Sequence, residues 1–254
     1  MILVIGGTKD SINIATKLQE LDYNVLVSAK TPYGEKIISQ NNLQPFEGRL
    51  GISSGELVNT LSANDISIVI DATHPFSNDL TKEIIHGCTK ANVPLIRFDR
   101  PNTELPKSDK LIRTDSFSEA AAITAQISTG NVFLAIGTNN LKYFTDKLNS
   151  NRVIARVLPV LNSLKKCLEL GLNPENIIAI QGPISYSLNR SLLKNYNASV
   201  LVTKDSGKQG GLLEKVNAAI DLNIDIIVID KPDYPNSMTA TDYQELVQLV
   251  KELI

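Results

Sequence analysis

Three polar residues follow an apolar strand in the first third of this chain. Residues 66–70 read Ile-Ser-Ile-Val-Ile, and Asp71, Thr73 and His74 come next, before Pro75 opens an expected helix. A buried parallel strand delivers such residues to the carboxyl edge of an α/β sheet, where ligands bind. His74 is one of two histidines in the chain and titrates near neutrality, so it is a candidate proton donor, with Asp71 as a second candidate. The structural alternative is that Asp71 caps the following helix and His74 completes the turn.

A glycine turn follows the first expected strand, at residues 2–5. Gly6, Gly7 and Thr8 precede a helix expected over 10–21. Glycines at this point let the backbone approach a phosphate, and the N–H groups of the helix start face the anion. The full G-x-G-x-x-G pattern is absent, so the alternative is a tight turn with Asp10 or Ser11 as the helix N-cap. The turn favours nucleotide binding.

The end of the second expected strand, at residues 24–28, bears on the choice of cofactor. NAD enzymes usually have a carboxylate there, which binds the ribose 2′-hydroxyl. This chain instead has Ser28 and then Lys30, and a hydroxyl and a cation suit a 2′-phosphate better. NADPH is therefore expected, with NADH as the alternative. Lys30 as a solvated loop lysine is the structural alternative.

The second half of the chain places glycines and small polar residues after four expected strands. The segments are 137–140, 156–159, 181–183 and 203–211. Carboxyl ends of parallel strands meet at one edge, so these segments are expected to converge there. The last segment supplies lysines, hydroxyls and backbone amides just before a helix, a set suited to carboxylates or phosphates. The alternative is a long solvated loop.

Strand-like and helix-like runs alternate throughout, which predicts an α/β fold. We expect two Rossmann-like parallel-sheet domains facing each other across a cleft. They are placed at residues 1–112 and 113–254, with a polar connector at about 99–131. The strands are predicted at 2–5, 24–28, 67–70, 94–98, 132–136, 152–157, 177–180, 199–202 and 224–229, and helices include 10–21, 78–91 and 243–253.

Composition excludes several classes of function. The net charge of -2 argues against a nucleic-acid-binding surface. The two cysteines, Cys88 and Cys167, are far apart and form no Cys-x-x-Cys, so we expect neither a disulfide framework nor a protein metal site. No apolar run approaches the roughly 20 residues that span a bilayer. The apolar start is too short for a signal peptide, so a cytoplasmic protein without membrane contact is expected.

Short motifs at these turns and strand ends run in order along nearly the whole chain. They are Ile5-Gly-Gly-Thr8, Tyr33-Gly34, Gly48-Arg49-Leu50, Asp71-Ala-Thr-His-Pro-Phe76, Arg97-Phe-Asp-Arg-Pro101, Phe133-Leu-Ala-Ile-Gly-Thr138, Asn140-Leu141, Arg156-Val-Leu-Pro159, Gln181-Gly-Pro183, Thr203-Lys-Asp-Ser-Gly207 and Gly210-Gly211. Together they resemble the precorrin-6A reductase family of corrin-ring biosynthesis, including its cobalt-precorrin-6A branch. The first turn departs from the usual family pattern after Thr8, as does Lys30, and both positions lie at the expected cofactor site.

The resemblance implies hydride transfer from a reduced nicotinamide to one double bond of the precorrin-6A macrocycle, giving the precorrin-6B form. Any cobalt would belong to the substrate. The protein would be a monomer or homodimer. Lys204, Asp205 and water compete with His74 as proton donors, and the many substrate carboxylates add Arg97 to the candidate cations. Expected cofactor contacts are Gly6, Gly7, Thr8, Ser28, Lys30, Thr73 and His74; expected substrate contacts are Arg49, Thr138, Arg156, Gln181, Gly182, Lys204, Ser206, Gly207, Gly210 and Gly211.

Three alternative functions stay open at this point. Tyr143 and Lys147 match the Tyr-x-x-x-Lys spacing of short-chain dehydrogenases, but no serine lies at the supporting position upstream, and an amphipathic surface explains the pair. An S-adenosylmethionine-dependent methyltransferase of the same pathway would use the glycine turn for a nucleoside. A nucleotide-sensing module would bind a nucleotide without turnover.

Overall fold

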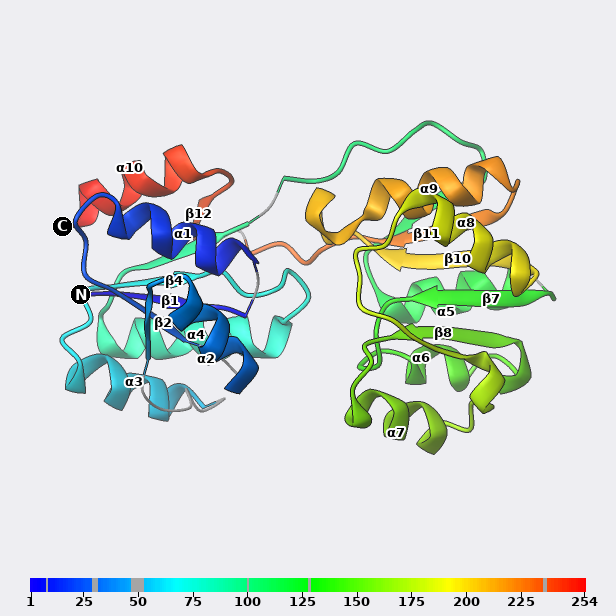
Figure 1. Cartoon of the computed structure of the whole chain (residues 1–254), viewed down its shortest axis with the longest axis horizontal. Helices are drawn as coiled ribbons and strands as arrows, with labels where there is room; N and C mark the ends of the chain where they lie inside the picture. The colour runs from blue at the N-terminus through cyan, green and yellow to red at the C-terminus, as the bar shows by residue number, and fades with distance from the viewer. Residues whose placement is uncertain (8, 29–31, 47–52, 100, 128, 235–236) are drawn as a thin grey trace. The chain divides into compact units, whose positions relative to one another are not determined.

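The chain forms two units, each with its own sheet and core. The structure is a computed structural model and describes residues 1–7, 9–28, 32–46, 53–99, 101–127, 129–234 and 237–254. Unit 1 comprises Met1–Pro101 and Pro232–Ile254, and unit 2 comprises Asn102–Lys231 (Figure 1). No helix in these described ranges is both long and apolar enough to cross a membrane.

The sheet of unit 1 has the strand order of a doubly wound nucleotide-binding fold. In the described residues it runs β12 (Met238–Ala240), β5 (Leu95–Phe98), β4 (Ile68–Asp71), β1 (Ile2–Ile5), β2 (Val25–Ser28), β3 (Gln44–Pro45), and neighbours pair in parallel. The order reverses between β1 and β4, and ligands of such sheets bind at that point. Ile5 pairs with both Ser28 and Asp71, so the carboxyl ends of these three strands lie level.

Helices cover both faces of this sheet, because its central strands are apolar on both sides. Ile2 and Val4 face one core with α1 (Lys9–Gln19), α2 (Pro32–Gln40) and α10 (Tyr243–Leu253). Leu3 and Ile5 face the other core with α3 (Ser54–Ala63) and α4 (Asn78–Ala91) (Figure 1). Fully burying one such side chain stabilises the fold by about 1.5–3 kcal/mol. This two-sided burial fixes the level of the strand ends.

Unit 2 repeats the arrangement. Its sheet runs β6 (Leu111–Thr114), β11 (Asp225–Ile229), β10 (Ala198–Lys204), β7 (Asn131–Ala135), β8 (Val153–Val157), β9 (Ile177–Ala179), with parallel neighbours and a reversal between β7 and β10. One face is covered by α8 (Tyr186–Asn195) and α9 (Leu212–Asp221), and the other by α5 (Phe117–Ile127), α6 (Lys142–Thr145) and α7 (Leu161–Glu169) (Figure 1). Short 3-10 turns occur at Ser150–Arg152, Pro174–Asn176 and Lys208–Gly210.

The chain passes from unit 1 to unit 2 after β5 and returns to unit 1 before β12, and each passage ends in an edge strand of the sheet that it enters. Strand β6 follows β5 in sequence but pairs with β11, and β12 follows β11 but pairs with β5. The helix after β12 returns with it, and Leu246 and Val250 are buried in the core of unit 1. The structure therefore begins unit 2 at Asn102 and assigns residues 232–254 to unit 1, in place of the predicted division at 112/113.

The sequence-based expectation of an α/β fold with two parallel-sheet domains is confirmed. The helices predicted at 78–91 and 243–253 have those bounds, and the predicted strands are found within a few residues. Three short edge strands, β3, β6 and β12, were not predicted. They have two to four residues each, too few to show a period.

Candidate active site

The turn between β1 and α1 packs directly under the end of β4. Gly6 is buried, and a Cβ placed on it would lie 2.7 Å from the carbonyl oxygen of Ala72. Gly7 is exposed, and a Cβ on it would meet no atom within 4 Å. Gly6 thus allows the close approach of two backbones, and Gly7 leaves space above the helix start, where an anion can bind.

The carboxylate of Asp71 ends β4 in a fully buried position. Its Oδ2 accepts from Nη1 of Arg97 at 2.6 Å, and its Oδ1 accepts from the backbone N–H of Thr73 at 2.9 Å. The same Nη1 lies 3.0 and 3.1 Å from the hydroxyls of Thr73 and Thr81, and the guanidinium lies over the Tyr234 ring. Both Asp71 oxygens are therefore engaged, which gives this residue a positioning role in the turn that follows β4.

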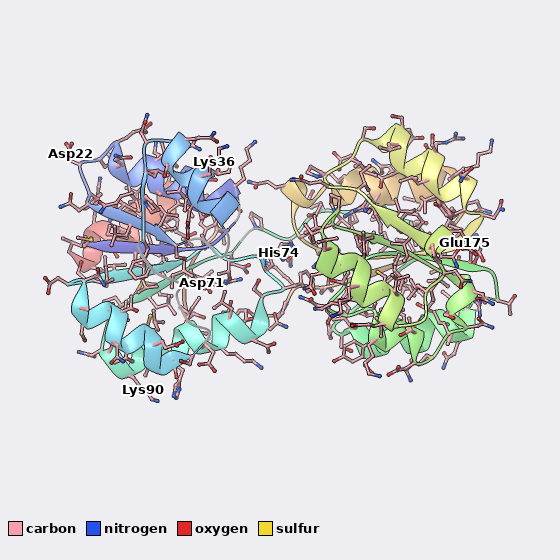
Figure 2. The ribbon with its side chains drawn as sticks, turned by 60° about the horizontal axis from the view of Figure 1, so that its bottom comes forward. Asp22, Lys36, Asp71, His74, Lys90 and Glu175 are labelled. Atoms are coloured by element: carbon pink, nitrogen blue, oxygen red, sulfur yellow. The ribbon has the colours of Figure 1, made fainter. Side chains whose placement is uncertain are left out.

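His74 is half-buried and immediately follows Thr73. Its Nδ1 accepts from the backbone N–H of Phe76 at 3.2 Å, so in the neutral ring this hydrogen bond assigns the proton to Nε2. The backbone carbonyl of His74 accepts from Ser77 at the start of α4. Figure 2 shows His74 farther from the middle of the unit 1 ribbon than Asp71. The histidine thus shapes the turn through one nitrogen and has a donor on the other.

A guanidinium on β8 of unit 2 lies near the loop after β9 and the first turns of α8. Arg156, on β8, is half-buried and donates from Nη1 to Oδ1 of Asn189 at 3.1 Å. A Cβ on Gly182 would lie 3.9 Å from Nη2 of this arginine, in ordinary contact. Burial lowers the pKa of Arg156 from its usual value. The side chain remains a cation at neutral pH, because an arginine titrates far above it.

Two lysines lie near this arginine, one of them inside the fold. Lys215, on α9, is 4% exposed and donates from Nζ to the carbonyl of Gly210 at 3.1 Å. Burial lowers its pKa to about 7, helped by the charges of Arg156 and Lys204 and opposed by Glu214 and Asp205. Burial also lowers the pKa of Lys204, at the end of β10, to about 8. This edge of unit 2 therefore concentrates positive charge in a water-poor setting.

Asp205 supports the loop that contains the predicted Ser206, Gly207, Gly210 and Gly211. It is buried and accepts from the backbone N–H of Gly207 at 3.2 Å, from both donors of Thr103, and from Nη2 of Arg113 at 2.8 Å. Arg113 also pairs with Asp230. With four donors around it, Asp205 fixes the backbone of the loop rather than serving as a proton donor.

The predicted site residues fall into two groups at the carboxyl edges of the two sheets. Thr8, Lys30 and Arg49 lie outside the described residues. Arg97 was predicted as a candidate cation for the substrate carboxylates, but its side chain is buried in an ion pair with Asp71. Unit 1 holds Gly6, Gly7, Ser28, Asp71, Thr73 and His74; unit 2 holds Thr138, Arg156, Gln181, Gly182, Lys204, Ser206, Gly207, Gly210 and Gly211.

Tyr143 and Lys147 do not form the pair of a short-chain dehydrogenase. The four-residue helix α6 ends at Thr145, before Lys147, and both side chains are exposed. Tyr143 stacks on Phe117 of α5 with ring centroids 6.2 Å apart. They also lie in unit 2, whereas the glycine turn lies in unit 1.

Sequence reasoning missed Lys215, although a signal was present. Leu212, Lys215, Val216 and Ala219 share the i, i+3, i+4, i+7 spacing of a buried helix face, and all four are buried. A lysine on an apolar stripe is a candidate for burial and a shifted pKa. No group of three or more metal-ligating His, Cys, Asp or Glu side chains occurs within the described ranges.

A family model and several named relatives match nearly the whole chain. A family model described as precorrin-6x reductase CbiJ/CobK matches residues 1–251. Two relatives named cobalt-precorrin-6A reductase are similar to this chain: one from Priestia megaterium is 32% identical, covering 97% of this chain and 96% of the relative, and one from Methanocaldococcus jannaschii is 34% identical, covering 99% and 98%. A precorrin-6A reductase from Rhodobacter capsulatus is 27% identical, covering 92% and 89%.

A solved structure shares the fold. It is described as CobK precorrin-6A reductase and superposes with a TM-score of 0.78 at 22% sequence identity. The match covers 99% of this chain and 96% of the other. It therefore includes both units and supports the α/β architecture described above.

The Asp71–Arg97 pair yields a stability prediction. Replacing Arg97 with Met leaves a buried carboxylate without its cation, and we expect unfolding free energy to fall by about 3–5 kcal/mol. Urea unfolding measures it. Arg113→Met is the matched control: Asp205 keeps three other donors, and Arg113 is 33% exposed, so its loss should be clearly smaller. Equal losses in the two variants would contradict this role of Asp71.

Proposed function

Because this chain belongs to the precorrin-6x reductase CbiJ/CobK family, we propose that it reduces cobalt-precorrin-6A to the precorrin-6B form in cobalamin biosynthesis. The relatives at 32% and 34% identity are both named cobalt-precorrin-6A reductase, which supports the cobalt-bound substrate. NADPH is the proposed reductant, and a reduced nicotinamide supplies the hydride when bound.

One observation supports this function above all: the cations at the carboxyl edge of unit 2. A tetrapyrrole substrate has several carboxylates, and Arg156 and Lys204 are cations suited to them. Burial of these cations strengthens their attraction for an anion, because the local dielectric is low. We assign unit 2 to the substrate.

We assign the cofactor to unit 1. Gly6 brings the turn against β4, and Gly7 leaves space for a phosphate above the start of α1. Ser28, at the end of β2, is a buried hydroxyl where NAD enzymes usually place a carboxylate, which supports NADPH. Thr73 and His74 border the same edge, where the nicotinamide would lie.

Anaerobic turnover tests the proposal. The protein is incubated with cobalt-precorrin-6A or precorrin-6A, each with NADPH or NADH, and cofactor oxidation is followed by absorbance. We expect the highest kcat/KM with NADPH and the cobalt form. Oxidation in none of the four combinations would refute the function, and heat stabilisation by S-adenosylmethionine alone would favour a methyltransferase.

A variant of the glycine turn localises the cofactor in the same assay. Gly7→Ala meets no neighbouring atom, so its melting temperature should stay unchanged. The added methyl group should raise the KM for NADPH while leaving the KM for the tetrapyrrole unchanged. An unchanged KM for NADPH would place the cofactor elsewhere.

His74 is the proposed proton donor to the second carbon of the reduced double bond. His74→Asn should lower kcat by a factor of about 100 or more, the usual contribution of a positioned acid. The control is His86→Asn, because His86 is exposed on α4, remote from the strand ends. A twofold effect or less at His74 would show that it only shapes the turn.

The pKa of Lys204 predicts a pH dependence of substrate capture. The charged lysine binds a carboxylate, and its pKa is about 8, so charge is lost as pH rises through that value. We therefore expect kcat/KM for the tetrapyrrole to fall above about pH 8. Lys204→Arg should move this fall to higher pH, because arginine stays charged. Identical alkaline limbs in the two proteins would exclude Lys204 as their source.

A further inference from the structure

An apolar patch follows β8 at the carboxyl edge of unit 2. Leu158, Val160 and Leu161 are 55%, 51% and 88% exposed, and they occupy three of four consecutive positions. Single exposed apolar residues are ordinary on a protein surface, but a contiguous group often marks a binding surface. Leu161 is the first residue of α7, so the patch lies where the strand ends and the helix begins.

The neighbours of the patch are loops that hold predicted substrate residues. Strand β8 lies between β7 and β9 in the sheet, so the loop after β8 is flanked by the loops after those strands. On one side Lys166 of α7 donates to Oδ1 of Asn139, next to Thr138. On the other side Arg156, two residues before Leu158, donates to Asn189 and lies near Gly182, where an added Cβ would come within 3.9 Å of its Nη2.

We propose that this apolar patch is the surface on which the ring face of the tetrapyrrole packs, while neighbouring cations bind its carboxylates. The inference rests on the proposed function. A corrin precursor presents a broad apolar ring with carboxylates at its periphery, and the protein presents apolar side chains beside Arg156. Charge complementarity thus selects this ligand over a purely apolar one. Nothing in the proposed cofactor site uses these residues.

Leu161 offers the sharpest test, because Leu168 on the same helix is a matched control. Leu168 is 54% exposed in the last turn of α7, at the end opposite Leu161. Leu161→Ser should raise the KM for cobalt-precorrin-6A roughly tenfold, the loss expected when part of a leucine contact is removed. The KM for NADPH and the melting temperature should stay unchanged. Leu168→Ser should behave as the wild type, and Leu161→Met should restore most of the affinity.

Two outcomes would overturn the inference while leaving the proposed function standing. One is an active wild-type enzyme whose substrate KM is the same in Leu161→Ser. The other is a wild-type dimer, seen by light scattering, that Leu161→Ser dissociates without changing the substrate KM, because the patch would then bind a second copy of the chain. A wild-type enzyme without turnover would instead refute the proposed function itself.

Discussion

The buried carboxylate of Asp71 is the constraint on which the site of unit 1 depends. An isolated charge in this position would be strongly unfavourable, and Arg97 compensates for it from the neighbouring strand. The pair also holds Thr73 and, through Thr81, helix α4. Its charge reaches Cys88, whose pKa is raised to about 12 by burial and by Asp71. The backbone leading to His74 is thus fixed by electrostatics as much as by packing.

Unit 2 also has a buried carboxylate after a central strand, Asp205, and its charge is compensated by different donors. Asp205 follows β10, the strand next to the reversal of order, as Asp71 ends β4 in unit 1. Each carboxylate accepts the N–H of the residue two positions later, which closes a tight turn before the site residues. Asp205 additionally accepts from Thr103, so the segment that opens unit 2 is tied to the loop after β10. The same carboxylate therefore holds both the segment where the chain enters unit 2 and the backbone of the loop after β10.

Much of the fold could be predicted because its central strands are apolar and β-branched. Runs such as Ile-Val-Ile before Asp71 must be buried on both faces, and helices with apolar stripes must cover them. The edge strands could not be predicted in this way. Met238–Ala240 has three residues and joins the sheet through pairing with β5, about 140 positions earlier in the chain. The local sequence pattern does not indicate which distant strand a short segment pairs with, so the assignment of residues 232–254 to unit 1 could not be predicted.

Site positions were predictable where they depend on strand ends, and side-chain partners were not. Arg97 lies at a strand end, where the sequence suggests a ligand-binding cation. In the structure it is paired across strands with Asp71, and its guanidinium forms a buried ion pair with that carboxylate. Lys215 is the opposite case: it lies in a helix, yet it is buried beside the cations of the strand ends. Its ammonium bonds to the carbonyl of Gly210, and desolvation with nearby positive charge disfavours its charged form. An anion bound at this edge would reverse part of that penalty. The burial that lowers the pKa of Lys215 would therefore also strengthen the attraction of its charged form for a carboxylate at this edge.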